Sequence, residues 1–463
     1  MTDFPRFMIA GAHKSSGKTV VSTGLAAAFS RTDPGVRTFK KGPDYIDPMW
    51  LGLASGASCY NLDFNAMDRD MIAPFFASRA GSLSLVEANK GLYDGMSPDG
   101  ADSNAELAKL LGLPVVLVID TRGMTRGIAP LLFGYRAFDP AVNIAGVILN
   151  QVGGARHEAK LRRAVETYTD IPVLGSVWRN SALEIGERHL GLTTPAENDH
   201  LERIIGGLGD VVTESVDLDR IRAVANAAPD LNPPAMPRKQ VPKVGQGLRI
   251  GVMRDAAFGF YYPDDLEAFE QAGARLVPID ALRDNHLPDV DGLFIGGGFP
   301  EMHMQALADN RTLRHALRGA LAAGLPCYAE CGGLMYLCES LSHGGRRLPM
   351  VGLIPGQAVM HRQPQGRGYV AFESTEAHPW AMPGEAVTAH EFHYASIEGL
   401  PEDTVFTRRM TRGTGVSGQR DGIHVANTVA GFCHLRNTCC RPWVSGFLSF
   451  VQSCKAERKI PAQ

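Results

Sequence analysis

The stretch RFMIAGAHKSSGKTVVSTGLAAAF (residues 6–29) has the pattern of a buried strand, a loop rich in glycine and serine, and a helix. Its apolar start, RFMIA (6–10), is typical of a strand that helices cover on both sheet faces. The loop ends in Gly17-Lys18-Thr19, as phosphate-binding loops do. Backbone N–H groups and a helix N-terminus form an anion site in this context, so the stretch predicts nucleotide binding in an α/β domain.

The loop is one residue longer than the usual G-x-x-x-x-G-K-S/T pattern, because five residues separate Gly11 from Gly17. The alternative interpretation is a Gly-Ser turn that merely caps a helix. The agreement of strand, loop, Lys-Thr pair and helix favours a nucleotide site, in which Lys18 reaches the terminal phosphates and the Thr19 hydroxyl binds Mg²⁺. The predicted nucleotide-binding residues are Gly11, Ser16, Gly17, Lys18 and Thr19.

Short apolar runs alternate with helical patterns through both halves of the chain, which predicts two domains with parallel α/β sheets. In the first half the predicted strands are 6–10, 36–39, 82–86, 114–120 and 143–150, and in the second half 249–253, 274–279, 291–297 and 325–330. The stretch ANAAPDLNPPAMPRKQVPKVGQG (225–247) is rich in proline and shows neither the hydrophobic period of a helix nor that of a strand. We therefore expect a first domain at 1–225, a linker at 226–247, a second domain at 248–454 and a polar tail at 455–463.

The composition of the 463 residues is that of a globular protein too long for one core, with 44% hydrophobic and 21% charged residues. The net charge of −3 gives no reason to expect a nucleic acid or a membrane as partner. Eight cysteines without Cys-x-x-Cys spacing disfavour structural zinc and favour a reducing cytoplasm.

A second candidate site lies in LPCYAECGGLMYL (325–337), which reads as a strand, Cys331 and the glycine-rich start of a helix. A sharp strand-to-helix turn of this kind exposes a nucleophile beside backbone N–H groups. Upstream, FIGGGFPE (294–301) supplies a loop that can approach an oxyanion, and FCHLR (432–436) offers His434 as a base. The alternative is that Cys331 is a buried core cysteine. The predicted oxyanion-binding residues are Gly296, Gly297, Gly298 and Gly332.

Several strings in order along the chain resemble the cobyrinic acid a,c-diamide synthase family. They are the long phosphate loop, FKKGPDYIDP (39–48), GLYDG (91–95) and ERHLGL (187–192), together with the Cys331 and His434 strings. The resemblance covers nearly the whole chain. It implies an N-terminal P-loop domain of the dethiobiotin synthetase-like type and a C-terminal class I glutamine amidotransferase-like α/β domain.

The resemblance also implies a chemistry. The N-terminal domain, 1–225, would use ATP to activate a carboxylate as an acyl phosphate, with Mg²⁺ held by Thr19, Asp47 and Glu87. Asp44, Tyr45 and Asp94 would lie near the reacting carboxylate. The second domain would release ammonia from glutamine through a thioester on Cys331, with His434 as base. Taken singly, each aspartate is more often a helix cap or a turn residue.

Two departures from the amidotransferase pattern concern the surroundings of His434. Many class I enzymes have glycine before the cysteine, where this chain has Glu330, and glutamate two residues after the histidine, where it has Arg436. We therefore expect a Cys331–His434 dyad without a carboxylate that orients the histidine. Lys40 is expected to face either phosphate or solvent, and the position of Lys41 stays open.

The family's substrates are anionic tetrapyrroles with ring acetate groups. A sirohaem amidase branch of the family is resembled by two stretches, EANKGLYDG (87–95) and the C-terminal residues 421–451. The alternative is that these stretches reflect sequence drift among the enzymes that act on cobyrinic acid. Both substrates stay open, with Arg188 and His189 as candidate contacts of the macrocycle. We expect no tightly bound prosthetic group, and a homodimer is plausible for the family.

Other function classes are less consistent with the sequence. HEFHY (390–394) lacks the HExxH spacing of a zinc site, so His390 and Tyr394 are expected near the amidotransferase site or a domain interface. A P-loop ATPase that acts as a binding switch would have no amidotransferase domain. A pseudo-amidotransferase that only binds a partner would not need the nucleophile, base and phosphate-loop residues found here.

Overall fold

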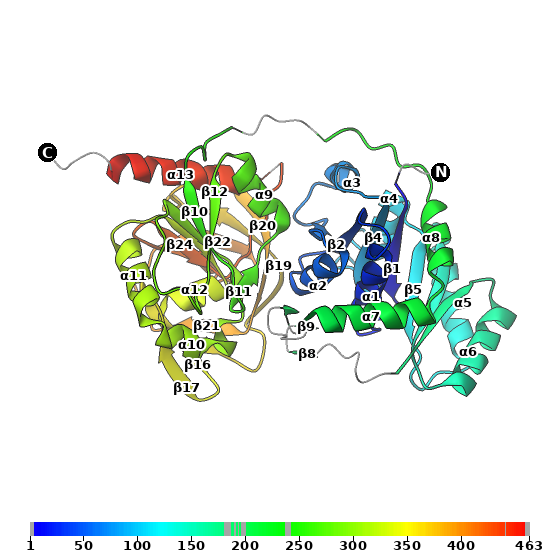
Figure 1. Ribbon diagram of the computed structural model, residues 1–463. Coiled ribbons are helices and arrows are strands. Elements are labelled where there is room, and N and C mark those ends of the chain that lie inside the picture. Colours follow the sequence, from blue (N-terminus) through cyan, green and yellow to red (C-terminus); the bar gives the residue numbers. More distant parts are fainter. Residues whose placement is uncertain are drawn as a thin grey trace. The chain divides into compact units, whose positions relative to one another are not determined.

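A computed structural model describes residues 4–179, 187–188, 191–192, 194–195, 201–236, 242–439 and 441–458 (Figure 1). The chain divides into two compact units, Met1–Pro237 and Arg238–Gln463. Both units have a sheet with helices on its faces, in agreement with the predicted α/β class. No helix in the described part of the chain combines the length and the apolar character needed to cross a bilayer.

The first unit is built on a seven-stranded sheet in the order β3-β2-β4-β1-β5-β6-β7. All neighbouring strands run parallel. The strands are β1 (Arg6–Gly11), β2 (Val36–Lys41), β3 (Tyr60–Leu62), β4 (Leu83–Gly91), β5 (Val115–Asp120), β6 (Ile144–Val152) and β7 (Val173–Trp178). The strands β2 and β4 extend past the predicted ends at 39 and 86, so Lys40 and Glu87 lie within strands.

Helices cover both faces of this sheet, as the continuous apolar strands require. One core cluster includes residues of α1 (Lys18–Ser30), α2 (Ile46–Ser55), α7 (Leu201–Ser215) and α8 (Leu218–Asn226). The cluster on the other face includes residues of α3 (Arg69–Ala77), α4 (Asn104–Leu111), α5 (Ile128–Phe138) and α6 (Ala155–Tyr168). Two short strands, β8 (Glu187–Arg188) and β9 (Gly191–Leu192), pair antiparallel. The candidate contact His189 lies outside the described residues, and of Arg188 only the backbone in β8 is described.

The second unit contains a nine-stranded sheet in the order β12-β10-β13-β15-β24-β23-β22-β19-β20. The strands from β12 to β24 run parallel, and those from β24 to β20 run antiparallel. These strands are β10 (Arg249–Met253), β12 (Arg275–Ile279), β13 (Gly292–Ile295), β15 (Cys327–Glu330), β19 (Gly366–Ser374), β20 (Ala386–His393), β22 (Phe406–Arg412), β23 (Arg420–Val425) and β24 (Thr428–Gly431). The antiparallel half adds to the parallel strands that the sequence predicted.

Smaller elements complete this unit. A four-stranded sheet contains β16 (Cys338–His343), β17 (Arg346–Pro349), β18 (Ile354–Met360) and β21 (Ala395–Glu398), and a two-stranded sheet contains β11 (Phe258–Phe260) and β14 (Gly297–Gly298). The helices are α9 (Pro263–Gln271), η3 (Pro300–Met302), α10 (Met304–Asp309), α11 (Arg311–Ala322), α12 (Gly332–Leu337) and α13 (Trp443–Arg458). The last helix continues past the predicted domain end at 454.

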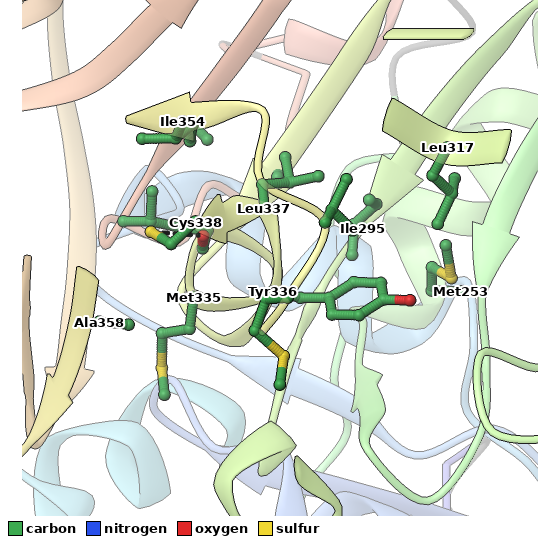
Figure 2. Packing of buried hydrophobic residues seen from close by; sticks show 14 of the residues in the cluster. Met253, Ile295, Leu317, Met335, Tyr336, Leu337, Cys338, Ile354 and Ala358 are labelled. Atoms are coloured by element: carbon green, nitrogen blue, oxygen red, sulfur yellow. Dashed lines mark hydrogen bonds between the residues drawn. The ribbon is translucent and has the colours of Figure 1, made fainter. Parts of the chain in front are cut away.

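The core of the second unit fixes the segment that follows Cys331. Every residue of α12 is buried, and Met335, Tyr336 and Leu337 belong to one apolar cluster with Ile295 of β13 and Ile354 of β18 (Figure 2). Burial of such side chains contributes about 1.5–3 kcal/mol each. The burial of the whole short helix fixes its position directly after Cys331.

The proline-rich segment begins after α8 ends at Asn226. Residues 229–236 form neither helix nor strand, and Pro229 O accepts a hydrogen bond from the buried Arg6 guanidinium at 2.6 Å. Leu231 and Met236 pack against the core of the first unit. The start of the predicted linker thus lies on the surface of the first unit.

Candidate active sites

The predicted phosphate loop joins β1 to α1 and is held from behind by a residue of β6, which β5 separates from β1 in the sheet. Asn150 of β6 donates from Nδ2 to Ser16 O at 2.9 Å, and Ser16 Oγ donates to His13 O at 2.7 Å. Gly17 has a φ of 84°, and a Cβ there would lie 2.0 Å from Asn150 Nδ2. Only glycine fits this position, because both the backbone angle and the amide behind it exclude a side chain.

Lys18 folds back over the loop, since its Nζ would lie 3.2 Å from a Cβ built on Gly11. Its side chain is buried. Burial and then the nearby Lys40 charge lower the pKa of Lys18 to about 8, although the carboxylates of Glu87, Asp47 and Asp94 act in the opposite direction. An anionic partner such as phosphate stabilises the charged form of an ammonium group that is buried in this way.

A lysine and two carboxylates form the centre of the site. The Lys40 Nζ lies 2.5 Å from Asp47 Oδ2 and 2.7 Å from Glu87 Oε1. Thr19 Oγ1, at the start of α1, donates to the same Glu87 oxygen at 2.9 Å. Lys40 is buried and its ammonium group pairs with the two acids, so the expectation that it faces solvent is wrong. The alternative that it faces phosphate stays a prediction.

These acids strongly influence one another. Burial lowers the pKa of Lys40, but the charges of Asp47 and Glu87 outweigh it and raise the pKa overall. Despite burial, the Lys40 charge and hydrogen bond hold the pKa of Asp47 below its usual value. Burial, and then the Asp47 charge, raise the pKa of Asp44 to about 7.

The residues predicted near the reacting carboxylate take three different positions. Asp44 accepts the Asp47 N–H at 3.1 Å and so orders the start of α2. Tyr45 is buried at the N-cap of that helix. Asp94 accepts the Gly91 N–H at 2.9 Å after β4 and acts on Lys18 by its charge. Asp44 and Asp94 therefore both make the local backbone hydrogen bonds that are common for aspartates in turns and helix caps. Both also interact by charge with groups of the site, Asp44 with Asp47 and Asp94 with Lys18.

Thr19, Asp47 and Glu87 fit a hard divalent cation. They supply one hydroxyl and two carboxylates, the oxygen donors that Mg²⁺ prefers. Glu87 Oε2 is buried and has no hydrogen-bond partner among the described residues. An orphaned carboxylate oxygen at this depth is suited to a cation.

The second predicted site surrounds the turn between β15 and α12. Cys331 has φ 49° and ψ −102°, a strained conformation for a non-glycine residue. Its N–H donates to Gly431 O of β24 at 2.7 Å, and its own carbonyl accepts the Met335 N–H at 3.1 Å. The side chain hydrogen-bonds to His434. The turn has the geometry of a nucleophile elbow.

His434 contacts a carboxylate that the sequence did not assign to it. Its Nδ1 lies 3.2 Å from Glu330 Oε2. The expectation that no carboxylate lies beside His434 is thus wrong, because the residue that replaces the usual glycine places one against its ring. Burial lowers the pKa of His434, but hydrogen bonds to Cys331 and Glu330 outweigh it and raise the pKa to about 10.

The glycine loop after β13 lies against both reactive residues. A Cβ on Gly297 would lie 2.7 Å from His434 Cε1, and one on Gly332 would lie 3.0 Å from Gly298 N. The Gly296 N–H already donates to the Tyr261 hydroxyl at 2.9 Å. The structure therefore brings Gly297, Gly298 and Gly332 to the site, whereas Gly296 has its N–H bonded elsewhere.

The HEFHY stretch reaches the same site through its first residue. The imidazole of His390 in β20 stacks on His434 with ring centroids 4.8 Å apart, and the two backbones form an isolated bridge. His393 instead stacks on Phe432 and hydrogen-bonds to Ala395 O. Tyr394 accepts the His361 N–H with its carbonyl. The expected proximity to the amidotransferase site holds for His390.

Comparison with known proteins identifies both units. The CobB/CobQ-like glutamine amidotransferase domain matches residues 249–438, and the CobQ/CobB/MinD/ParA nucleotide binding domain matches residues 7–192. A cobyrinate a,c-diamide synthase of Magnetococcus marinus is 43% identical over 437 residues, which cover 93% of this chain and 94% of that protein. One of Methanosarcina acetivorans is 38% identical and covers 98% of this chain and 97% of that protein. With its two domains in this order and relatives similar over the full length, the chain belongs to the cobyrinate a,c-diamide synthase family.

Proposed function

We propose that the protein is a glutamine-hydrolysing, ATP-dependent ligase that amidates the a and c carboxylates of cobyrinic acid. The reaction and the substrate are inferred from the full-length relatives, which are named as cobyrinate a,c-diamide synthases. The placement of a phosphate loop beside an acidic cluster in one unit, and of Cys331 beside His434 in the other, supports it.

In the first unit, the loop backbone and Lys18 bind the phosphates of ATP. Thr19, Asp47 and Glu87 would hold Mg²⁺, which when bound would neutralise charge that develops on the transferred phosphoryl group. The substrate carboxylate attacks the terminal phosphorus and becomes an acyl phosphate, with ADP as leaving group. Ammonia then attacks the acyl carbon, phosphate leaves, and the nitrogen loses a proton. Asp44, with a pKa raised to about 7 by burial and by Asp47, is suited to accept that proton near neutral pH.

In the second unit, the Cys331 thiolate attacks the side-chain carboxamide carbon of glutamine. We infer that the backbone of Gly297, Gly298 and Gly332 stabilises the oxyanion, because Gly297 lies against His434 and Gly332 lies against Gly298. Protonated His434 gives its proton to the departing nitrogen, so ammonia leaves and a thioester remains. Neutral His434 then takes a proton from the water that hydrolyses the thioester to glutamate.

Mass spectrometry of the product tests the substrate. The protein is incubated with ATP, Mg²⁺ and glutamine, with cobyrinic acid and sirohaem in parallel reactions. Each amidation replaces OH by NH₂ and lowers the product mass accordingly. We expect two such steps on cobyrinic acid. Amidation of sirohaem alone would instead support the branch that EANKGLYDG resembles, and ADP formation without product would show that another carboxylate is the substrate.

The homodimer stays a prediction. A passage of ammonia between the two sites is a further hypothesis, because one site produces a volatile nucleophile that the other consumes. Efficient capture of the released ammonia by an external scavenger during turnover would count against the passage.

A further inference from the structure

We propose that Glu330 is the positioning residue of His434, and thus that the residue before the nucleophile supplies the third member of a Cys331–His434–Glu330 triad. The inference rests on the proposed glutamine hydrolysis. It assigns to the end of β15 a role that the amidotransferase pattern gives to a glutamate two residues after the histidine, where this chain has Arg436.

The geometry is that of an orienting carboxylate. Glu330 Oε2 lies 3.2 Å from His434 Nδ1, so the other ring nitrogen is left for the Cys331 hydrogen bond. Both Glu330 and His434 are almost fully buried, with 2% and 3% of their side chains exposed. A carboxylate on Nδ1 fixes the tautomer and orientation of the ring and stabilises the imidazolium.

Glu330 is itself held in place by its second oxygen. Glu330 Oε1 accepts the Leu435 N–H at 2.8 Å and the Tyr328 hydroxyl at 2.7 Å. The Leu435 contact anchors the carboxylate to the residue next to His434, and Tyr328 belongs to the same strand as Glu330. Among the described residues the carboxylate therefore hydrogen-bonds to three partners, of which His434 alone takes part in the proposed chemistry.

A buried ion pair extends this support. Arg408 of β22 donates to the Tyr328 hydroxyl at 3.2 Å and pairs with Asp421 of β23 at 3.0 Å. Asp421 in turn accepts the Phe432 N–H at 2.8 Å. The segment that carries His434 is thus tied to the sheet on both sides of the histidine, from Phe432 through Asp421 and from Leu435 through Glu330.

Other charged groups near His434 have partners of their own. Arg436 pairs with Asp264 of α9 at 3.0 Å. Asp265 accepts the Asn437 N–H at 2.6 Å, and burial together with the Asp264 charge raises its pKa. Burial, then the charge on His434, lowers the pKa of His390. Glu330 is the carboxylate with a hydrogen bond to the His434 ring in the described structure.

The experiment compares Glu330→Gln with wild type in the full-length protein. Glutamine can keep the Leu435 bond but offers a neutral group to His434 Nδ1. We expect kcat for glutamine hydrolysis to fall roughly 10²- to 10⁴-fold, with KM for glutamine within a few-fold and ammonia-dependent amidation unchanged. The high-pH limb of the kcat profile should also move to lower pH, because the imidazolium has lost its carboxylate. Glu339→Gln, at an exposed position in the same unit, is the control and should change none of these.

Two outcomes would overturn the inference. One is a Glu330→Gln variant with the kcat and pH profile of wild type. The other is a loss of ammonia-dependent activity and of stability in proportion to glutamine hydrolysis, which would make Glu330 purely structural. If wild type hydrolyses no glutamine at all, the proposed function fails rather than this assignment.

Discussion

The ammonium group of Lys40 lies 2.7 Å from the carboxylate of Glu87, and both side chains are buried. The pair joins the end of β2 to β4, directly beside the start of α1. Asp47 completes the contact from α2, so one lysine balances two acids in the interior of the first unit.

Replacing Lys40 by methionine should lower the free energy of unfolding of the first unit by about 3–5 kcal/mol, because it leaves buried carboxylates without their cation. Urea denaturation followed by circular dichroism measures this. Lys109→Met is the control, since Lys109 is one-third exposed and its surface pairs with Glu106 and Asp139 contribute about 1 kcal/mol or less. Equal losses in the two variants would show that the buried charges are not coupled as described.

The same variant should respond to Mg²⁺ more than wild type does. Without the Lys40 ammonium group, Thr19, Asp47 and Glu87 present uncompensated oxygens to a cation, and binding to the folded state stabilises it. Thermal unfolding with Mg²⁺ or with EDTA measures the difference in melting temperature. Adding Glu87→Gln to the variant should abolish the gain, and a gain that persists would place the cation elsewhere.

Gly17→Ala should weaken ATP binding by at least about tenfold, because its Cβ would displace Asn150 and distort the loop. Gly56→Ala is a matched control. Gly56 also has a positive φ, 67°, but a Cβ there meets nothing within 4 Å, so the variant carries only the backbone cost of roughly 1 kcal/mol. Calorimetric titration with ATP compares the two. Equal affinities would mean that the loop tolerates a side chain at Gly17.

The strands around the phosphate loop and the cysteine elbow could be predicted from the sequence because each of these sites is built from contiguous residues. The partners of those residues could not, because they come from distant strands. Asn150 is 134 residues from Ser16, and Glu330 is 104 residues from His434. Lys40 was noticed, but its pairing with two acids was not predicted, because that pairing depends on the register of β2 against β4. The sequence contained one indication of the role of Glu330, its unusual position directly before the nucleophile. That its carboxylate contacts His434 is seen only in the fold.

Arg408→Met should destabilise the second unit by about 3–5 kcal/mol, since it leaves Asp421 charged and fully buried. Arg409→Met, on the same strand, is the control because Arg409 is 68% exposed and pairs with Glu373 at the surface. Its expected cost is below about 1 kcal/mol. Guanidinium denaturation separates these values, and similar midpoints for the two variants would argue against the buried pair.

Asp44 should make the stability of the first unit depend on pH. Burial and the Asp47 charge raise its pKa from 3.8 to about 7, so the folded state binds the proton more tightly than the unfolded state does. The resulting stabilisation is complete below pH 3.8 and is lost as pH rises through about 7. Unfolding free energies of wild type minus those of Asp44→Asn should therefore fall across this range. A flat difference would show that Asp44 titrates normally.

The most direct test of the account is the nitrogen source of Cys331→Ser. Wild type and variant are supplied with ATP, Mg²⁺ and cobyrinic acid, with either glutamine or ammonium chloride, and amide product is measured. The account predicts that the variant makes no product from glutamine but the wild-type amount from ammonium. Product from glutamine in the variant, or none from ammonium while wild type forms it, would contradict the assignment of ammonia release to Cys331 and of ligation to the other unit.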